Sequence, residues 1–198
     1  MKKIVVGISG ATGSIYAVRL MEALKRTKGV ETHLILSSWA EENIRLETSY
    51  NVEQIMRLAD RVHDFKNLGA PVASGSFLAD GMVIVPCSMK TLSSVAHGYA
   101  DNLIVRAADV MLKERRRLVV VVRETPLNSI HLENMLKLSN AGAIITPPMP
   151  AFYNHPKSLE DIIRHHTGRT LDLLGIENML TKRWTGETEM GESVYLAE

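Results

Sequence analysis

The sequence predicts an α/β protein: a doubly wound parallel sheet in three α/β/α layers, built as a single domain. Two observations predict this fold. Short apolar runs alternate with helical patterns along most of the 198 residues, which is the pattern of successive βαβ units. The apolar runs also lack regular polar interruptions, as is typical of parallel strands that are buried on both faces.

The individual elements follow from the same alternation. Strands are expected at Ile4–Ile8, Glu31–Leu36, Met82–Cys87, Leu118–Val122 and Ala143–Thr146. Helices are expected at Ser14–Thr27, Trp39–Thr48, Val52–Ala59, Ser88–Ala96, Asn102–Glu114, Leu132–Leu138 and Leu159–Leu174. The prolines of Pro147–Pro150 exclude a helix there and predict an extended segment. We therefore expect a folded domain over residues 1–180 and an irregular C-terminal tail over residues 181–198.

The composition excludes several classes of protein. The 23 basic and 22 acidic residues leave a net charge of +1, which disfavours nucleic acid as a partner. No apolar run approaches the ~20 residues of a membrane span, and the first apolar run is too short for the apolar region of a signal peptide. The single cysteine, Cys87, suits a reducing cytoplasm. The seven histidines have no metal-ligand spacing, so we expect no metal.

A glycine-rich turn joins the first predicted strand to the first predicted helix. Such a turn can place a phosphate on the N-terminus of a helix. Its glycines, Gly7, Gly10 and Gly13, do not have the spacing of a dinucleotide-binding motif, and no P-loop lysine follows. The turn therefore leaves two interpretations open: a phosphate-binding site, or a tight connection that needs glycine for its backbone.

Polar side chains follow most of the predicted strands, at the edge where α/β proteins bind ligands. A dinucleotide-binding enzyme usually has Asp or Glu after its second strand, to hold a ribose. This chain has Ser37 and Ser38 there. Their hydroxyls favour a mononucleotide such as FMN over NAD, although a serine that only caps the next helix is the alternative.

Charged side chains are candidates for chemistry at two places. Arg106 and Lys113 are seven residues apart in one predicted helix, so they lie on the same face. Arg123 and Glu124 end the fourth predicted strand, where the guanidinium could hold an anion and the carboxylate could act as a general acid or base. The buried-turn interpretation is favoured for Cys87, because no basic neighbour is evident that would stabilise a thiolate.

Six ordered motifs carry a resemblance to a known family. They are Gly7–Gly13, Pro86–Thr91, Arg106–Asp109, Leu112–Arg115, Arg123–Pro126 and Pro150–Tyr153. Together they resemble the UbiX family of flavin prenyltransferases, long described as phenylacrylic or aromatic acid decarboxylase subunits. The resemblance extends roughly from Lys3 to Trp184.

The resemblance implies a Rossmann-like flavoprotein that joins a dimethylallyl group to N5 and C6 of reduced FMN. The implied donor is dimethylallyl phosphate, and no metal is needed. The product, prenylated FMN, passes to a UbiD-type decarboxylase that acts on aromatic or α,β-unsaturated acids. Members of the family assemble as homododecamers with sites between subunits.

The resemblance also implies roles for particular residues. Glu124 matches the family's acid/base glutamate, while Lys113, Tyr153 and Arg169 would hold the prenyl phosphate. Thr12, Glu47 and Ser74 match further site positions, Thr12 standing where many members have serine. Leu68 stands where some members carry an aromatic residue, and Trp184 matches a C-terminal tryptophan that covers the site. The flavin would be held by Gly10, Ala11, Thr12, Ser37, Ser88, Met89, Lys90, Thr91, Arg106 and Arg123.

Two other functions stay open beside prenyl transfer. A flavoprotein that itself decarboxylates an aromatic acid or a peptidyl cysteine would release carbon dioxide without a partner protein. The cysteine decarboxylases use a histidine base near the flavin, and no histidine stands at a predicted strand end. A non-catalytic FMN carrier would have no use for the implied phosphate-binding residues Lys113, Tyr153 and Arg169.

Overall fold

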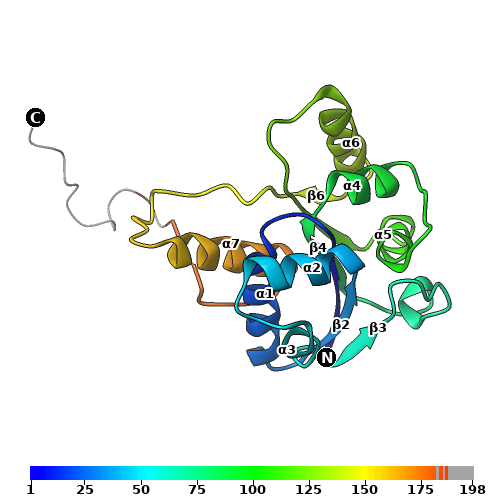
Figure 1. Ribbon diagram of the computed structural model, residues 1–198, viewed down its shortest axis with the longest axis horizontal. Helices are drawn as coiled ribbons and strands as arrows, with labels where there is room; N and C mark the ends of the chain where they lie inside the picture. Colours follow the sequence, from blue (N-terminus) through cyan, green and yellow to red (C-terminus); the bar gives the residue numbers. More distant parts are fainter. Residues whose placement is uncertain (182, 185, 187–198) are drawn as a thin grey trace, which may run out of the picture.

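The computed structural model describes residues 1–181, 183, 184 and 186. Within them, six parallel strands form one sheet in the order β3-β2-β1-β4-β5-β6 (Figure 1). The strands are β1 (Lys2–Ile8), β2 (Val30–Leu36), β3 (Arg61–His63), β4 (Gly81–Cys87), β5 (Arg117–Val122) and β6 (Ile144–Ile145). This is the strand order of a Rossmann-like fold, and the direction of winding reverses between β1 and β4. The predicted doubly wound parallel sheet is confirmed.

Seven α-helices and one short 3-10 helix connect these strands in the described part of the chain. They are α1 (Ser14–Arg26), α2 (Ser38–Glu47), α3 (Val52–Met56), η1 (Pro71–Ala73), α4 (Met89–Ala96), α5 (Leu103–Lys113), α6 (Ser129–Asn140) and α7 (Leu159–Leu173). Each predicted helix is present, and no end is shifted by more than three residues. The largest shift at a start is in α6, which begins early because Asn128 and His131 form a capping box.

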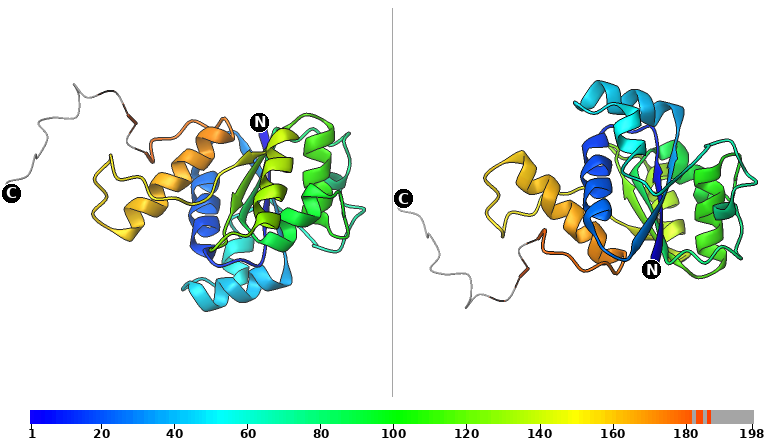
Figure 2. Two further views of the ribbon diagram at one scale, coloured as in Figure 1. Left: turned by 90° about the horizontal axis from the view of Figure 1, so that it is seen from above. Right: turned by 90° about the horizontal axis from the view of Figure 1, so that it is seen from below.

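Two hydrophobic cores lie on opposite faces of the sheet, because successive strand side chains point to opposite sides. In β1, Val5 packs with α4, α5 and α6, whereas Ile4 and Val6 pack with α1, α2, α3 and α7. Figure 2 shows α1 and α7 on one side of the sheet and α4 and α5 on the other. The predicted three α/β/α layers are confirmed, and burial of both faces explains why the strand sequences do not alternate.

One strand was missing from the sequence prediction. Arg61–His63 forms β3 beside β2 at the edge of the sheet. It has only three residues, and its Val62 is 44% exposed, so it carries no apolar run that a sequence pattern could detect. At the opposite edge, β6 is also shorter than the predicted Ala143–Thr146.

A long irregular segment leads from β6 to α7 and extends away from the sheet (Figure 2). Pro147–Pro150 is non-helical, as predicted. Met149 and Phe152 are 72% and 68% exposed on this segment. Most of the predicted tail, residues 181–198, lies outside the described residues. None of the described helices is long and apolar enough to span a membrane.

Candidate functional site

A cleft of about 200 Å³ opens where β1, β2 and β4 end. These strand ends meet at the point where the winding of the sheet reverses, which is where open α/β sheets bind ligands. The structure therefore brings together five residues that the sequence assigned to the flavin. The lining residues are Gly10, Ser37, Ser38, Trp39, Phe65, Ser88, Lys90, Thr91, Ser94 and Asn102.

Hydrogen bonds join the neighbouring strand ends next to this cleft. The buried Ser9 hydroxyl donates to the carbonyl of Pro86 at 2.9 Å and accepts the amide of Ser88 at 2.8 Å. The amide of Ser37 donates to the carbonyl of Ile8 at 3.1 Å. The three strand ends are thus held in register, and Ser9 is a structural residue of the site that was not among the predicted binding residues.

Two helices begin at the cleft, and each is capped by a serine. Ser37 accepts the amide of Ala40 at 3.1 Å at the start of α2. Ser88 accepts the amide of Thr91 at 3.3 Å at the start of α4, and its hydroxyl donates to the Thr91 hydroxyl at 3.1 Å. Helix N-termini carry partial positive charge and free amides, which favour an anion. The cap interpretation of Ser37 holds, and it is compatible with binding a phosphate.

The turn after β1 passes very close to α2. A Cβ atom added at Gly10 would lie 2.4 Å from the Cβ of Trp39, so only glycine fits there. Trp39 itself is 70% exposed and lines the cleft. The sequence prediction missed Trp39 and Phe65, although an aromatic residue directly after the Ser37-Ser38 strand end is a signal that could have found the first.

These lining residues fit the phosphate and ring system of FMN. None of them is acidic, four serines and one threonine supply hydroxyls, and Trp39 and Phe65 supply aromatic surface. Met89, assigned to the flavin from sequence, is only partly buried at the start of α4 and packs against the core.

In the same turn after β1, the carboxylate of Glu47 lies at the N-terminus of α1. Oε2 of Glu47 accepts the amides of Gly13 at 2.8 Å and Ser14 at 2.9 Å. Burial alone would raise the pKa of Glu47, but bonds from Ser14, the Thr12 hydroxyl and Gly13 outweigh it and hold this pKa below its ordinary value. Gly13 has a φ of +97°, so the turn also requires glycine for its backbone.

The end of β5 places Arg123 and Glu124 beside β4. The amide of Arg123 donates to the carbonyl of Cys87 at 3.1 Å. Burial raises the pKa of Tyr16 in α1, and the nearby Arg123 guanidinium partly opposes that rise. Glu124 is exposed, and its Oε1 accepts the amide of Thr125 at 2.9 Å. Glu124 is therefore accessible for proton transfer at this edge of the sheet.

A second group of predicted site residues lies along α5. Arg106 donates from Nε to the carbonyl of Ala73 at 3.1 Å and pairs with Asp109 at 2.7 Å. Lys113 forms an ion pair with Glu114, and a Cβ at Gly75 would lie 2.8 Å from the Lys113 Nζ. Arg106 and Lys113 thus face the same 73–75 segment, which confirms that they share one face of the helix. The predicted Ser74 lies in this segment and contacts Ser76.

A third group gathers around α7. The Tyr153 ring packs edge-on against His165 at 5.7 Å and against Trp184 at 5.8 Å, centroid to centroid. Burial lowers the pKa of His165, and the Arg169 guanidinium lowers it further. Arg169 pairs with Asp172 at 2.9 Å. The predicted substrate residues Tyr153 and Arg169 are therefore both near His165.

A single chain does not bring the site residues of α5 together with those around α7. Lys113 lies on α5, which packs on one face of the sheet, whereas Arg169 lies on α7, which packs on the other (Figure 1). Within the described ranges, no group of three or more His, Cys, Asp or Glu side chains is arranged to hold a metal ion. Cys87 is fully buried, and this burial raises the pKa of its thiol, as expected for a structural residue.

The fold and the cleft define an α/β protein that binds a mononucleotide at the carboxyl ends of its strands. Residues 1–169 match the family model described as Flavoprotein. The flavin prenyltransferase LpdB of Lactiplantibacillus plantarum is 56% identical over 187 residues, which are 94% of this chain and 100% of that relative. The chain belongs to the flavoprotein family and, within it, to the UbiX-like flavin prenyltransferases.

Two solved structures are similar over nearly the whole chain. AnUbiX (PadA1), solved in complex with FMN and dimethylallyl pyrophosphate, has a TM-score of 0.91 at 53% identity, covering 93% of this chain and 98% of that one. A dodecameric FMN-dependent UbiX-like decarboxylase from Escherichia coli O157:H7 also has a TM-score of 0.91, at 52% identity, covering 93% of this chain and all of the other.

Proposed function

We propose that this protein is a flavin prenyltransferase that transfers the dimethylallyl group of dimethylallyl phosphate to reduced FMN. A bond forms from the allylic carbon to N5 of the flavin as the allylic C–O bond breaks, and the N5 proton leaves with inorganic phosphate. A second bond forms from the prenyl double bond to C6; the alkene gains one proton and C6 loses one, so the flavin gains C5H8. The observation that carries this proposal is the likeness to AnUbiX, which was solved with both FMN and dimethylallyl pyrophosphate. The monophosphate as donor is our prediction from the family resemblance.

The cleft at the strand ends would hold FMN. Its phosphate fits beside Ser37, Ser88 and Thr91, where α2 and α4 begin. Lys90 lines the same cleft and adds a positive charge. Gly10 packs closely against Trp39. Both residues line the cleft, so the indole would lie beside the bound flavin. Arg123 at the end of β5 would contact the flavin from the neighbouring strand.

The remaining site residues would stabilise the leaving phosphate and transfer the proton between the flavin and that phosphate. Lys113, Tyr153 and Arg169 offer two cations and a phenol, which stabilise the negative charge that develops on the leaving phosphate. Glu124 is exposed at the end of β5 and would carry a proton between the flavin and that phosphate. Such a site has to exclude water, because water would trap the allylic carbon as an alcohol.

Neighbouring copies of the chain would complete the site. Lys113 and Arg169 lie on opposite layers of one subunit, and the similar protein from E. coli O157:H7 is dodecameric. We therefore propose a homo-oligomer, a dodecamer by similarity, in which one copy supplies Lys113 and another supplies Tyr153 and Arg169. The recipient of the product would be a UbiD-type decarboxylase in the cytoplasm.

Decarboxylation by the protein itself is the second candidate, because the E. coli structure is described as a decarboxylase. The two functions are separated by anaerobic incubation with reduced FMN and dimethylallyl phosphate, followed by mass spectrometry of the extracted flavin. Prenyl transfer predicts a heavier flavin and no carbon dioxide from an added aromatic acid. A decarboxylase predicts carbon dioxide with an unchanged flavin, and an FMN carrier predicts neither.

A further inference from the structure

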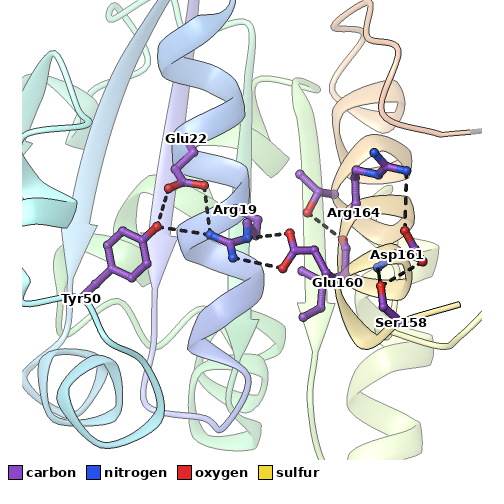
Figure 3. Close-up of polar contacts among 9 residues, drawn as sticks. Arg19, Glu22, Tyr50, Ser158, Glu160, Asp161 and Arg164 are labelled. Carbon is purple, nitrogen blue, oxygen red and sulfur yellow. Dashed lines mark hydrogen bonds and ion pairs between the residues drawn. The ribbon is translucent and has the colours of Figure 1, made fainter. Parts of the chain in front are cut away.

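Arg19 joins three segments of the chain that come from different parts of the sequence. Its guanidinium forms two bonds with Glu160 at the start of α7, at 2.8 Å and 3.0 Å. It also contacts Glu22 and the Tyr50 hydroxyl, each at 3.2 Å. Figure 3 shows Arg19 between Glu160 on one side and Tyr50 with Glu22 on the other. A two-pronged arginine–carboxylate pair fixes orientation as well as distance.

The first turn of α7 is less buried than the rest of the helix, in which Ile163 is already only 4% exposed, so a polar contact at the first turn adds to its attachment. Leu171 and Leu174 are almost completely buried, whereas Leu159 is 70% exposed. Ser158 and Asp161 bond to each other and cap the helix locally, which does not tie it to the rest of the molecule. The Arg19–Glu160 pair links this end of the helix to α1, and the side chain of Arg19 is only 28% exposed.

The helix that this pair holds carries one part of the proposed prenyl phosphate site. Arg169 lies on α7, and Tyr153 precedes α7 and packs on His165 of the same helix. A shift at the start of α7 would therefore move both the guanidinium and the phenol.

On its other side, Arg19 is connected to Glu47 through Tyr50 and Thr48. Tyr50 donates its hydroxyl to Glu22 at 2.6 Å, and its amide donates to the Thr48 hydroxyl at 3.1 Å. Thr48 directly follows Glu47, which stands on the first turn of α1. Arg19 thus contacts Tyr50, close in sequence to Glu47, and Glu160, which begins the helix that positions Tyr153 and Arg169.

We propose that Arg19 is a positioning residue for the prenyl phosphate, which it serves by fixing α7 and the loop after α2 relative to α1. This proposal rests on the proposed function. The flavin cleft is built from the ends of β1, β2 and β4 and does not depend on Arg19. Loss of Arg19 should therefore weaken the phosphate substrate and spare the flavin.

The test measures two dissociation constants by calorimetry, one for FMN and one for dimethylallyl phosphate added to the FMN complex. Arg19→Met removes the charge and keeps most of the side chain. We expect a Kd for dimethylallyl phosphate raised about tenfold, since small misplacements at such sites have effects of this order or larger, and an unchanged Kd for FMN. Arg19→Lys should fall between Arg19→Met and the wild type.

The matched control is Lys25→Met, also in α1. Lys25 pairs with Asp60 at 3.3 Å in the loop before β3, away from α7, so both constants should stay as in the wild type. The double variant Arg19→Glu with Glu160→Arg restores a pair of opposite charge and should recover part of the lost affinity, even if Arg19→Met folds poorly.

Two results would overturn the proposal while the proposed function stands: unchanged affinity for dimethylallyl phosphate in Arg19→Met, or equal losses for both ligands. A wild-type protein that binds FMN but not dimethylallyl phosphate would instead remove the proposed function, and this proposal with it.

Discussion

Glu47 lies with one carboxylate oxygen 2.8 Å from the amide of Gly13, at the N-terminus of α1. The sequence left this turn open between a phosphate site and a tight connection. In the structure the turn is a tight connection and also binds an anion. Gly13 has the positive φ of a tight turn, and the anion at the helix end is a side chain of the protein.

Replacing Glu47 with Gln should destabilise the protein at neutral pH by about 0.5 to 1 kcal/mol, the usual value of a charge at a helix N-terminus. The folded-state pKa of Glu47 is depressed, so its stabilising contribution is present above the ordinary carboxyl pKa and is lost as the pH falls through the folded value. Urea unfolding at pH 7 and pH 3 measures this. The gap between variant and wild type should close at pH 3, and an equal gap at both would contradict the assignment.

Gly10→Ala should weaken FMN binding and lower stability by about 1 to 3 kcal/mol, the usual cost of overpacking, because the new Cβ would collide with Trp39. Titration of flavin fluorescence and thermal unfolding measure the two effects. Adding Trp39→Gly, which removes the colliding Cβ, should recover part of the stability but not the flavin affinity, since the indole also lines the cleft. No recovery of stability would show that the collision is not the cause.

Ser88→Ala and Asn51→Ala form a matched pair that separates capping from ligand binding. Each side chain caps a helix, so each variant should lose about 1 kcal/mol of stability. Only Ser88 stands at the flavin cleft. Equilibrium binding of FMN should therefore weaken about tenfold in Ser88→Ala, as expected for a lost bond to a charged group, and stay unchanged in Asn51→Ala. Equal FMN affinities in the two variants would show that Ser88 does not bind the flavin phosphate.

Mixing two inactive variants tests whether neighbouring copies complete the site. Lys113→Ala and Tyr153→Phe would each be inactive alone. If Lys113 and Tyr153 act from different chains, co-expressed and co-assembled oligomers contain some sites with both residues intact. Prenylation by doubly tagged oligomers should then exceed that of either parent. Activity no higher than the parents' would place both residues in a site formed by one chain.

Acid should destabilise the protein through His166. Burial, with a smaller contribution from His165, lowers the pKa of His166 to about 4. The unfolded state binds this proton below about pH 6.5, so stability falls as the pH drops from about 6.5 to 4, by about 2 to 3 kcal/mol in all. His166→Phe keeps an aromatic ring against Tyr16 and should remove that part of the pH dependence, as measured by thermal unfolding at pH 7 and pH 4.5. An unaltered pH dependence would contradict it.

The sequence predicted the layers and the flavin side of the site because these depend on local patterns. Buried apolar runs marked five of the six strands, and the serines after β2 and β4, Ser37 and Ser88, marked the two caps that line the cleft. β3 could not be found, since three residues at a sheet edge bury too little to leave a pattern. Trp39 and Glu47 act through contacts across the fold, and nothing next to them in sequence shows that they would meet Gly10 and Gly13.

Lys113, Tyr153 and Arg169 show a different limit. Their roles came from resemblance alone, and the chain places them on opposite faces of its sheet. In the proposed oligomer, neighbouring copies would bring them to one phosphate, and no pattern within a single sequence describes that arrangement.

The central claim is that FMN is the acceptor of a prenyl group, and the mass of the flavin after anaerobic incubation of the reduced form with dimethylallyl phosphate tests it most directly. Wild-type protein should yield a flavin heavier by one C5H8 unit, with one inorganic phosphate released for each flavin changed. Glu124→Gln should bind the flavin and convert it far more slowly. An unchanged flavin mass with the wild-type protein, under conditions where both substrates bind, would contradict the account.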